Sequence, residues 1–271
     1  MTENTYGFVK RLEFIRSAIQ DAQPRRVLDL GCGTGENLTR PLAGRFQQIE
    51  FVAIDSDRAS IDFAKRSNQC PNATYIHESE AGDLGVFDMV IASEVLEHVE
   101  APIEFLKSIR RHLSEVGTAV ITLPNGYGPF EWASFIESLW FFSGGYRFLH
   151  AVRQRDHMLQ TDIPAADTLA VSPHINFFGY GQVRSLLIAA GFRISTFRSR
   201  TFLCGFGFDH LMRSKSIISW NCGIADRLPP QLVSAWMFVL KPSAETHPRP
   251  FSRNLYSRVR RYLNERRWGL L

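Results

Sequence analysis

The stretch VLDLGCGTG, residues 27–35, decides the fold of this chain. Its apolar beginning is typical of a buried strand, its three glycines stand two residues apart, and the residues after them predict a helix over 37–46. Glycine adopts backbone angles that a Cβ forbids, and it lets a ligand lie against bare main chain. A strand, a glycine loop and a helix in this order predict the first nucleotide-binding unit of a doubly wound α/β fold.

The spacing of the glycines and the position of the next acid narrow the class of ligand. The pattern is D-x-G-x-G-x-G, whereas a dinucleotide fingerprint reads G-x-G-x-x-G. Twenty residues after Gly35, a second apolar run at 49–54 ends in Asp55, where an acid can bind both hydroxyls of a ribose. A lone glycine loop can be a simple tight turn. The ordered series of strand, loop, helix, strand and acid favours nucleotide binding instead.

These motifs resemble those of the class I S-adenosylmethionine-dependent methyltransferases, in the generic small-molecule branch that includes quinone-biosynthesis enzymes. The resemblance covers roughly residues 27–241 and implies S-adenosyl-L-methionine as the cofactor. The family often carries an acid shortly after the third strand, but the aligned position here is Ser79, which leaves Glu78 and Ser79 as the expected adenine contacts. The cofactor-binding residues that the resemblance implies are Asp29, Gly31, Cys32, Gly33, Gly35, Asp55, Ser56, Glu78, Ser79 and Ser93.

Apolar strands alternate with amphipathic helices along the chain, which predicts a parallel sheet with helices on both faces. The family's sheet has seven strands, and its last strand returns antiparallel between the fifth and the sixth. The expected strands are 27–30, 49–55, 73–77, 87–92, 117–123, 192–200 and 234–241, and the expected helices are 6–20, 37–46, 58–68, 103–113 and 181–190.

Two long insertions and a basic tail depart from this alternation. We expect a methyltransferase domain over 1–241, with insertions at 126–173 and 201–231, and a tail over 242–271. The first insertion is rich in aromatic residues, and both emerge where the strands end, which is where ligands bind in open α/β sheets. We interpret them together as a lid that binds the acceptor. The alternative is extra scaffold packed on the sheet.

Methyl transfer to oxygen requires placement of the acceptor and removal of its proton. His174, in the run SPHINFF at 172–178, is the candidate catalytic base, and His157 is a weaker one. Asn125, after the fifth strand, is expected to touch acceptor or cofactor. A lone histidine is more often structural, so this assignment depends on where the fold places the ring.

The run SEVLEHV at 93–99 looks like the family's motif after the fourth strand, and it has two interpretations. Glu94, Glu97 and His98 stand at i, i+3 and i+4, which on a helix would put oxygen and nitrogen ligands for a divalent ion on one face. Small-RNA 2′-O-methyltransferases and some quinone O-methyltransferases are similar here. In the interpretation we favour, the residues orient the local turn and no metal binds.

Charge is concentrated in the tail. Residues 242–271 carry seven Arg and two Glu, which is a net charge of +5. Because the whole chain has a net charge of +4, residues 1–241 together carry −1. A near-neutral body argues against a nucleic-acid-binding surface. Residues 253–268 place Leu255, Val259, Tyr262 and Leu263 at helical spacing among arginines, a pattern typical of a helix on an anionic membrane surface. For one short segment, a solvated or partner-packed terminal helix is the commoner case, so both interpretations stay open.

The remaining composition indicates a cytoplasmic protein. The N-terminus has no signal-peptide pattern, no apolar stretch reaches the length of a membrane span, and the four cysteines are scattered. We therefore expect a cytoplasmic methyltransferase, peripheral at the inner membrane face, that acts on oxygen of a small-molecule, sugar or lipid-linked acceptor. The alternatives are a metal-assisted RNA 2′-O-methyltransferase and a non-catalytic subunit that only binds cofactor.

Overall fold

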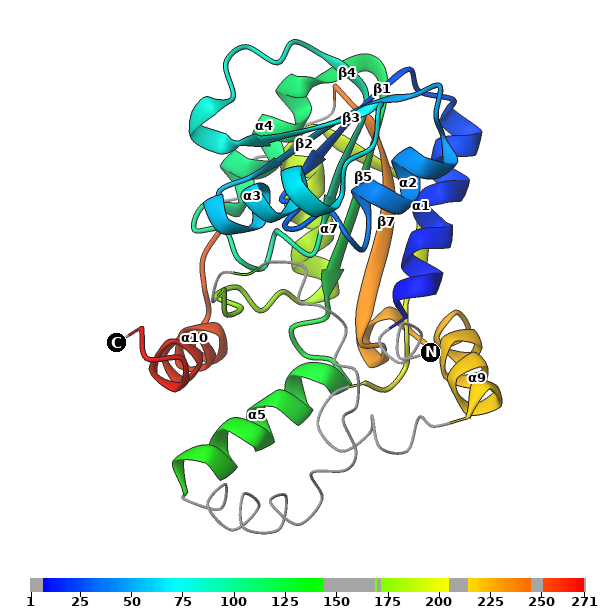
Figure 1. Ribbon diagram of the computed structural model, residues 1–271. Coiled ribbons are helices and arrows are strands. Elements are labelled where there is room, and N and C mark those ends of the chain that lie inside the picture. The colour runs from blue at the N-terminus through cyan, green and yellow to red at the C-terminus, as the bar shows by residue number, and fades with distance from the viewer. Residues whose placement is uncertain (1–6, 144–168, 170–171, 205–213, 245–250, 271) are drawn as a thin grey trace.

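The computed structural model describes residues 7–143, 169, 172–204, 214–244 and 251–270. These residues contain a seven-stranded sheet in the order β3-β2-β1-β4-β5-β7-β6 (Figure 1). The strand β7 is antiparallel to both of its neighbours, and the other pairs are parallel, so the predicted topology is confirmed. The strands are β1 (Arg26–Leu30), β2 (Glu50–Asp55), β3 (Ala73–His77), β4 (Phe87–Ser93), β5 (Leu113–Pro124), β6 (Phe192–Ser199) and β7 (Ala235–Pro242).

Helices cover both faces of the sheet, because successive strand residues point to opposite sides. In β2, Phe51 packs with the buried residues of α1 and α2, whereas Val52 packs with those of α4 and α7. Ala53 returns to the first side, against α3. The helices of the first layer are α1 (Phe8–Ala22), α2 (Thr39–Arg45) and α3 (Arg58–Ser67), and those of the second are α4 (Pro102–His112) and α7 (Tyr180–Ala189).

Three further helices lie beyond the carboxyl ends of the parallel strands: α5 (Pro129–Phe142), α9 (Lys215–Ala225) and α10 (Leu255–Arg267) (Figure 1). Two short 3-10 turns, Glu78–Glu80 and Pro230–Leu232, complete the described elements. The helices α5 and α9 come from the two predicted insertions. The other insertion residues, at 144–168, 170–171 and 205–213, lie outside the described part of the chain, and His157 is among them.

Every boundary of an expected strand or helix lies within two residues of its sequence-based position except the start of β5. The strand β5 begins at Leu113 rather than at 117, because residues 114–116 are partly or fully exposed and give no apolar run to detect. The helix α7 begins at Tyr180, one residue before the expected start, and does not include His174. His174 instead lies in an extended segment, residues 172–179, that runs beside the carboxyl ends of the strands.

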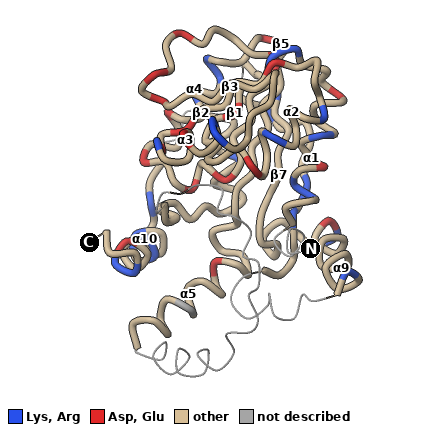
Figure 2. The backbone as a smooth tube through the Cα atoms, viewed as in Figure 1, with Lys and Arg blue, Asp and Glu red and all other residues tan. Residues whose placement is uncertain are grey.

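The tail helix α10 buries polar side chains and exposes apolar ones, which is the reverse of an ordinary amphipathic helix on a hydrophobic core. Its buried side chains are the polar residues Ser257, Arg260 and Asn264. Its exposed residues include Leu255, Val259 and Tyr262, which the sequence had grouped by spacing, and Figure 2 shows its cluster of basic residues. The helix packs against α5, which exposes Trp140, Phe141 and Phe142. Among the described helices, none has the length and apolarity that crossing a bilayer requires.

Candidate functional site

A cavity of about 550 Å³ opens at the carboxyl ends of β1, β2 and β4. It joins the glycine loop to the residues after β4 and to the segment that carries His174. Seven of the predicted site residues line it: Gly31, Gly33, Asp55, Ser56, Glu78, Ser93 and His174. The sequence did not indicate the contribution of α1, whose residues Phe8 and Arg11 also line the cavity.

The glycine loop is shaped by contacts that a side chain would block. Gly31 has φ +76°, and a Cβ there would lie 2.4 Å from a methyl group of Val95. Gly35 has φ +70°, and its Cβ would lie 2.5 Å from the ring of Tyr75. Both contacts are far below van der Waals distance, so the spacing of glycines follows from close packing as well as from backbone angle.

Asp55 ties this loop to the end of β2. One carboxylate oxygen accepts a hydrogen bond from the Gly33 amide at 2.7 Å, and the other accepts from the Asp57 amide at 2.8 Å. A carboxylate offers about four acceptor positions. Two remain on the cavity side, where they can accept from hydroxyl groups of a ligand.

Four predicted cofactor residues do not line the cavity. Asp29 is buried behind the loop and accepts a hydrogen bond from the Thr39 hydroxyl at 2.6 Å, which holds the start of α2. Burial raises the pKa of the Cys32 thiol well above its usual value, so this side chain is a packing residue. Gly35 packs against Tyr75 as described. Ser79 donates its hydroxyl to Nδ1 of His77 at 2.7 Å.

Asn125 is also turned away from the cavity. Its amide nitrogen donates to the carbonyl oxygens of Gln231 and Val233, and its side-chain oxygen accepts from the Tyr127 amide. The side chain therefore joins the loop after β5 to the segment before β7.

The helical face considered for residues 93–99 does not form, so Glu94, Glu97 and His98, the alternative metal-ligand trio, do not share one face of a helix. The segment is a turn, and Glu94 has φ +59°. The Glu94 carboxylate forms an ion pair with Arg200 at 2.9 Å and accepts from the Thr122 hydroxyl at 2.8 Å. Although burial opposes it, Arg200 lowers the pKa of Glu94 below the usual range.

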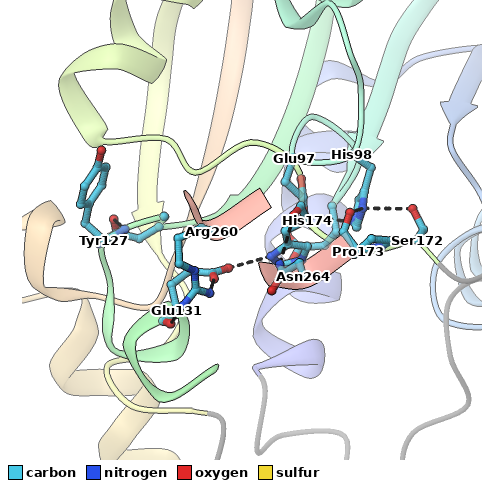
Figure 3. Close-up of polar contacts among 12 residues, drawn as sticks. Glu97, His98, Tyr127, Glu131, Ser172, Pro173, His174, Arg260 and Asn264 are labelled. Carbon is cyan, nitrogen blue, oxygen red and sulfur yellow. Dashed lines mark hydrogen bonds and ion pairs between the residues drawn. The ribbon is translucent and has the colours of Figure 1, made fainter. Parts of the chain in front are cut away.

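His174 takes the place of Glu94 in the cluster that does form (Figure 3). Glu97, His98 and His174 each offer one ligand atom, and these three atoms lie within 4.8 Å of one another. Glu97 is fully buried, and neither of its carboxylate oxygens has a hydrogen-bond partner. A buried acid without a partner costs folding free energy. Such a group at a cavity wall is a candidate for binding a proton, a ligand or an ion.

The two histidines are oriented by the bonds at their Nδ1 atoms. The Nδ1 of His98 lies 3.2 Å from the Pro173 carbonyl oxygen and 3.1 Å from the Ser172 hydroxyl. We place the hydrogen on this nitrogen, because the carbonyl oxygen can only accept and the hydroxyl oxygen can accept as well. The Nδ1 of His174 donates to a Glu131 carboxylate oxygen at 2.7 Å. Both bonds leave the Nε2 atoms for the cluster around Glu97.

Protonation of the cluster follows from burial and neighbouring charge. Burial and the adjacent His174 lower the pKa of His98 to about 4, so His98 is neutral near pH 7. Burial opposes a charge on His174, but Glu131 outweighs it and raises the pKa of His174 to about 9. Burial and Glu94 raise the pKa of Glu97 to about 8. The cluster therefore pairs a neutral histidine with a cationic one.

Glu131, which the sequence analysis missed, has a second partner in Arg260 of α10 at 2.7 Å. Glu131 stands in the first turn of α5, where an acidic residue is common because it interacts favourably with the helix N-terminus. Arg260 stands in a cluster of arginines of the kind usually found on a protein surface. The residues lie 129 positions apart. No local pattern in one sequence pairs them.

Comparisons with known proteins agree with this architecture. The family described as "Methyltransferase domain" matches residues 6–196. The ubiquinone biosynthesis O-methyltransferase of Rickettsia canadensis is 32% identical over 118 residues, which is 42% of this chain and 49% of that protein. The malonyl-[acyl-carrier protein] O-methyltransferase of Halalkalibacterium halodurans is 28% identical over 114 residues, 40% of this chain and 41% of that protein. The chain thus spans about half the length of the curated relatives it matches.

Solved structures share the fold at low sequence identity. A putative sarcosine dimethylglycine methyltransferase from Galdieria sulphuraria has a TM-score of 0.52 at 13% identity, covering 87% of this chain and 86% of that one. The plantazolicin methyltransferase BpumL in complex with SAH has a TM-score of 0.51 at 16% identity, covering 89% and 86%. The family match extends over more than half of the chain. The chain therefore belongs to the class I S-adenosylmethionine-dependent methyltransferases.

Proposed function

We propose that this protein transfers the methyl group of S-adenosylmethionine to a hydroxyl oxygen of a small-molecule, sugar or lipid-linked acceptor. The observation that carries the proposal is one cavity lined both by the glycine loop with Asp55 and by the cluster of Glu97, His98 and His174. The first set fits a nucleoside and the second suits activation of an acceptor hydroxyl. The match to O-methyltransferases among the relatives supports oxygen as the methylated atom.

The residues of the cavity fit the cofactor. Gly31 and Gly33 leave main chain bare, and Asp55 retains acceptor positions for a ribose diol. Arg11, which is 3% exposed, lines the same cavity and carries the charge that the methionine carboxylate requires. When bound, S-adenosylmethionine supplies an electrophilic methyl group on its sulfonium. The protein's task is then to place the acceptor oxygen and to remove its proton.

The electrostatics of the cluster divide that task between the two histidines. His174 was the expected base, but its ion pair with Glu131 favours the imidazolium, which has no lone pair to take a proton. His98 is neutral, and its Nδ1–H leaves a lone pair on Nε2. We therefore assign proton removal to His98 and stabilisation of the developing oxyanion to His174. With the cofactor bound, His98 would take the proton that the acceptor oxygen loses, and His174 would stabilise the negative charge on that oxygen while the sulfonium supplies the methyl group.

The cofactor half of the site is tested by Asp55→Ala. Loss of a charged hydrogen-bond partner should weaken S-adenosylmethionine binding by about 1.5–3 kcal/mol, because the ribose diol loses its acceptor. Gly33→Val should abolish binding, since φ at this position is +55° and the space beside it is needed by the ligand. Gly223→Ala, in an open part of α9, is the matched control. Unchanged calorimetric affinity in both site variants would remove the cofactor assignment.

The acceptor half is tested with methyl-labelled S-adenosylmethionine and a panel of phenolic acids, phenolic lipids and sugars. On whichever acceptor is labelled, His98→Ala should lower kcat by roughly 10²–10⁴ with cofactor affinity unchanged. In the wild type, kcat/KM should fall as pH decreases through about 4, because protonated His98 is no base. His112→Ala, outside the cavity, is the control.

Other outcomes of that experiment point elsewhere. A His98→Ala enzyme with full activity, beside an inactive His174→Ala enzyme whose parent gains activity as pH rises through about 9, would return the role of base to His174. Cofactor binding without label transfer to any acceptor would favour the alternative of a non-catalytic binding subunit.

A metal-assisted reaction is a second candidate, because Glu97, His98 and His174 each offer one ligand atom within 4.8 Å of the others. Glu97 lies 4.0 Å from Nε2 of His98, while the two Nδ1 atoms are held by Pro173 and Glu131. Histidine ligands of metals are oriented in this way. On the proposal that we prefer, treatment with a chelator leaves activity unaltered. Loss of activity that magnesium or manganese restores would make Glu97, His98 and His174 ligands, and it would revive the RNA 2′-O-methyltransferase alternative.

We further propose that the outward face of α10 contacts an anionic membrane surface. Leu255, Val259 and Tyr262 are exposed beside Arg258 and Arg266, an arrangement that suits a helix lying in the headgroup region. Each Arg near an anionic leaflet contributes about 1 kcal/mol. This location would bring a lipid-linked acceptor to the cavity.

Sedimentation with vesicles that contain phosphatidylserine tests the membrane contact. Val259→Glu should release the protein from the vesicles, and added salt should weaken wild-type binding. Val116→Glu changes an exposed valine at the start of β5, away from α10, and should leave binding intact. Deletion of the tail is a poorer test, because it also removes the inward side chains of α10. A wild-type protein that stays in the supernatant at low salt would contradict the membrane proposal.

A further inference from the structure

The inward face of α10 holds the segment that carries His174. Asn264 donates its side-chain amide to the His174 carbonyl oxygen at 3.1 Å. Ser257 donates its hydroxyl to the Phe177 carbonyl oxygen at 3.1 Å. Just before the helix, Arg253 donates to the side-chain oxygen of Asn176 at 2.9 Å. Three successive contacts thus attach one element to the 172–179 segment, which has no helix or strand of its own.

Arg260 is the most deeply placed side chain of this face. It is 1% exposed, and its guanidinium lies 5.1 Å from the ring centre of Phe135 and 4.9 Å from that of Phe177. One terminal nitrogen donates to the Glu131 carbonyl oxygen at 2.9 Å, and the other donates to the Glu131 carboxylate at 2.7 Å. Two bonds in a fixed planar fork define the position of Glu131 in a way that a single ammonium would not.

Glu131 connects Arg260 to the His174 ring in the cavity wall. One carboxylate oxygen is bound by Arg260 and the other by Nδ1 of His174 (Figure 3). The position of the carboxylate therefore sets the position of the imidazole, and the imidazole stands in the cluster with Glu97 and His98. Glu131 thus connects Arg260 to His174 in the cavity wall.

We propose that Arg260 is a positioning residue for acceptor methylation: from the tail helix and through Glu131, it fixes the orientation of the His174 ring in the cavity. The proposal rests on the proposed function only in its prediction that the loss of Arg260 lowers turnover. The structural part, that Arg260 determines the environment of the His174 ring, holds whether or not the acceptor is a hydroxyl compound.

The test compares Arg260→Met with Arg258→Met, an exposed arginine on the opposite side of the same helix. Each change removes one positive charge from α10 and substitutes the same side chain. The ring resonance of His174, assigned in the NMR spectrum by its absence from His174→Gln, should move in Arg260→Met and stay in Arg258→Met. Calorimetric affinity for S-adenosylmethionine should remain within twofold in both variants.

Turnover on a phenolic acceptor labelled by the wild type should fall about ten- to a hundredfold in Arg260→Met, since small misplacements of a reacting group have effects of this size. Arg260→Lys keeps the positive charge but loses the planar pair of donors, so its turnover should lie between that of Arg260→Met and that of the wild type. Should Arg260→Met fail to fold by circular dichroism, the same measurements on Arg260→Lys decide the question.

An unmoved His174 resonance in a folded Arg260 variant would overturn the proposal, and so would a loss of turnover that matches a loss of cofactor affinity. A moved resonance in a protein that methylates none of the acceptors would leave the positioning role standing and reject the proposed function. The two failures are therefore distinguishable.

Discussion

The carboxylate of Glu131 is almost wholly withdrawn from water, and its charge has to be balanced inside the protein. Arg260 takes one oxygen and His174 takes the other. A buried charge without such partners is strongly unfavourable, because the free-energy cost of taking the charge out of water is then not compensated by an opposite charge or by hydrogen bonds. This single group therefore obliges α5, α10 and the 172–179 segment to meet at one place. The wall of the cavity that carries His174 is built around that meeting point.

The cofactor side depends on a different kind of constraint. There the glycine loop, the end of β2 and the turn after β4 come from residues that are close in sequence or adjacent in a parallel sheet. Asp55 holds Gly33 through one hydrogen bond, and Val95 packs against Gly31. The scaffold is fixed by backbone geometry and short contacts. It would keep its form if the outer helices were exchanged for others, as expected of a fold that carries many functions.

This difference explains how much could be predicted from the sequence. Buried parallel strands are continuous apolar runs, so β1, β2, β3 and β4 were located to within a residue or two, and the sheet order followed from the family resemblance. The cavity residues of the glycine loop and Asp55 were found for the same reason. Asp29 and Ser79 were assigned to the cofactor from their positions, but their side chains have local partners in Thr39 and His77.

The cavity wall that carries His174 was recognised only in part. His174 was identified, but its charge state depends on Glu131, and the partner of Glu131 lies in a helix for which spacing left both a membrane contact and a partner-packed position open. In α10 the polar residues are buried and the apolar ones are exposed. Arg260 and Asn264 face inward, where they donate to the Glu131 carboxylate and the His174 carbonyl oxygen. Leu255 and Val259 face outward. Periodicity identifies the two faces of a helix. It does not tell which one is buried when the buried surface is polar.

The placement of α10 also has a consequence for the order in which the two sides of the cavity can be completed during synthesis. Every residue that shapes the glycine loop precedes residue 100, and the last sheet strand ends at Pro242. A nascent chain that has exposed those residues can assemble the sheet. The carboxylate of Glu131 then stays without its arginine until Leu255–Arg267 have left the ribosome. Ordering of the wall that carries His174 therefore follows synthesis of the sheet, which separates completion of the glycine loop from completion of the Glu131 ion pairs.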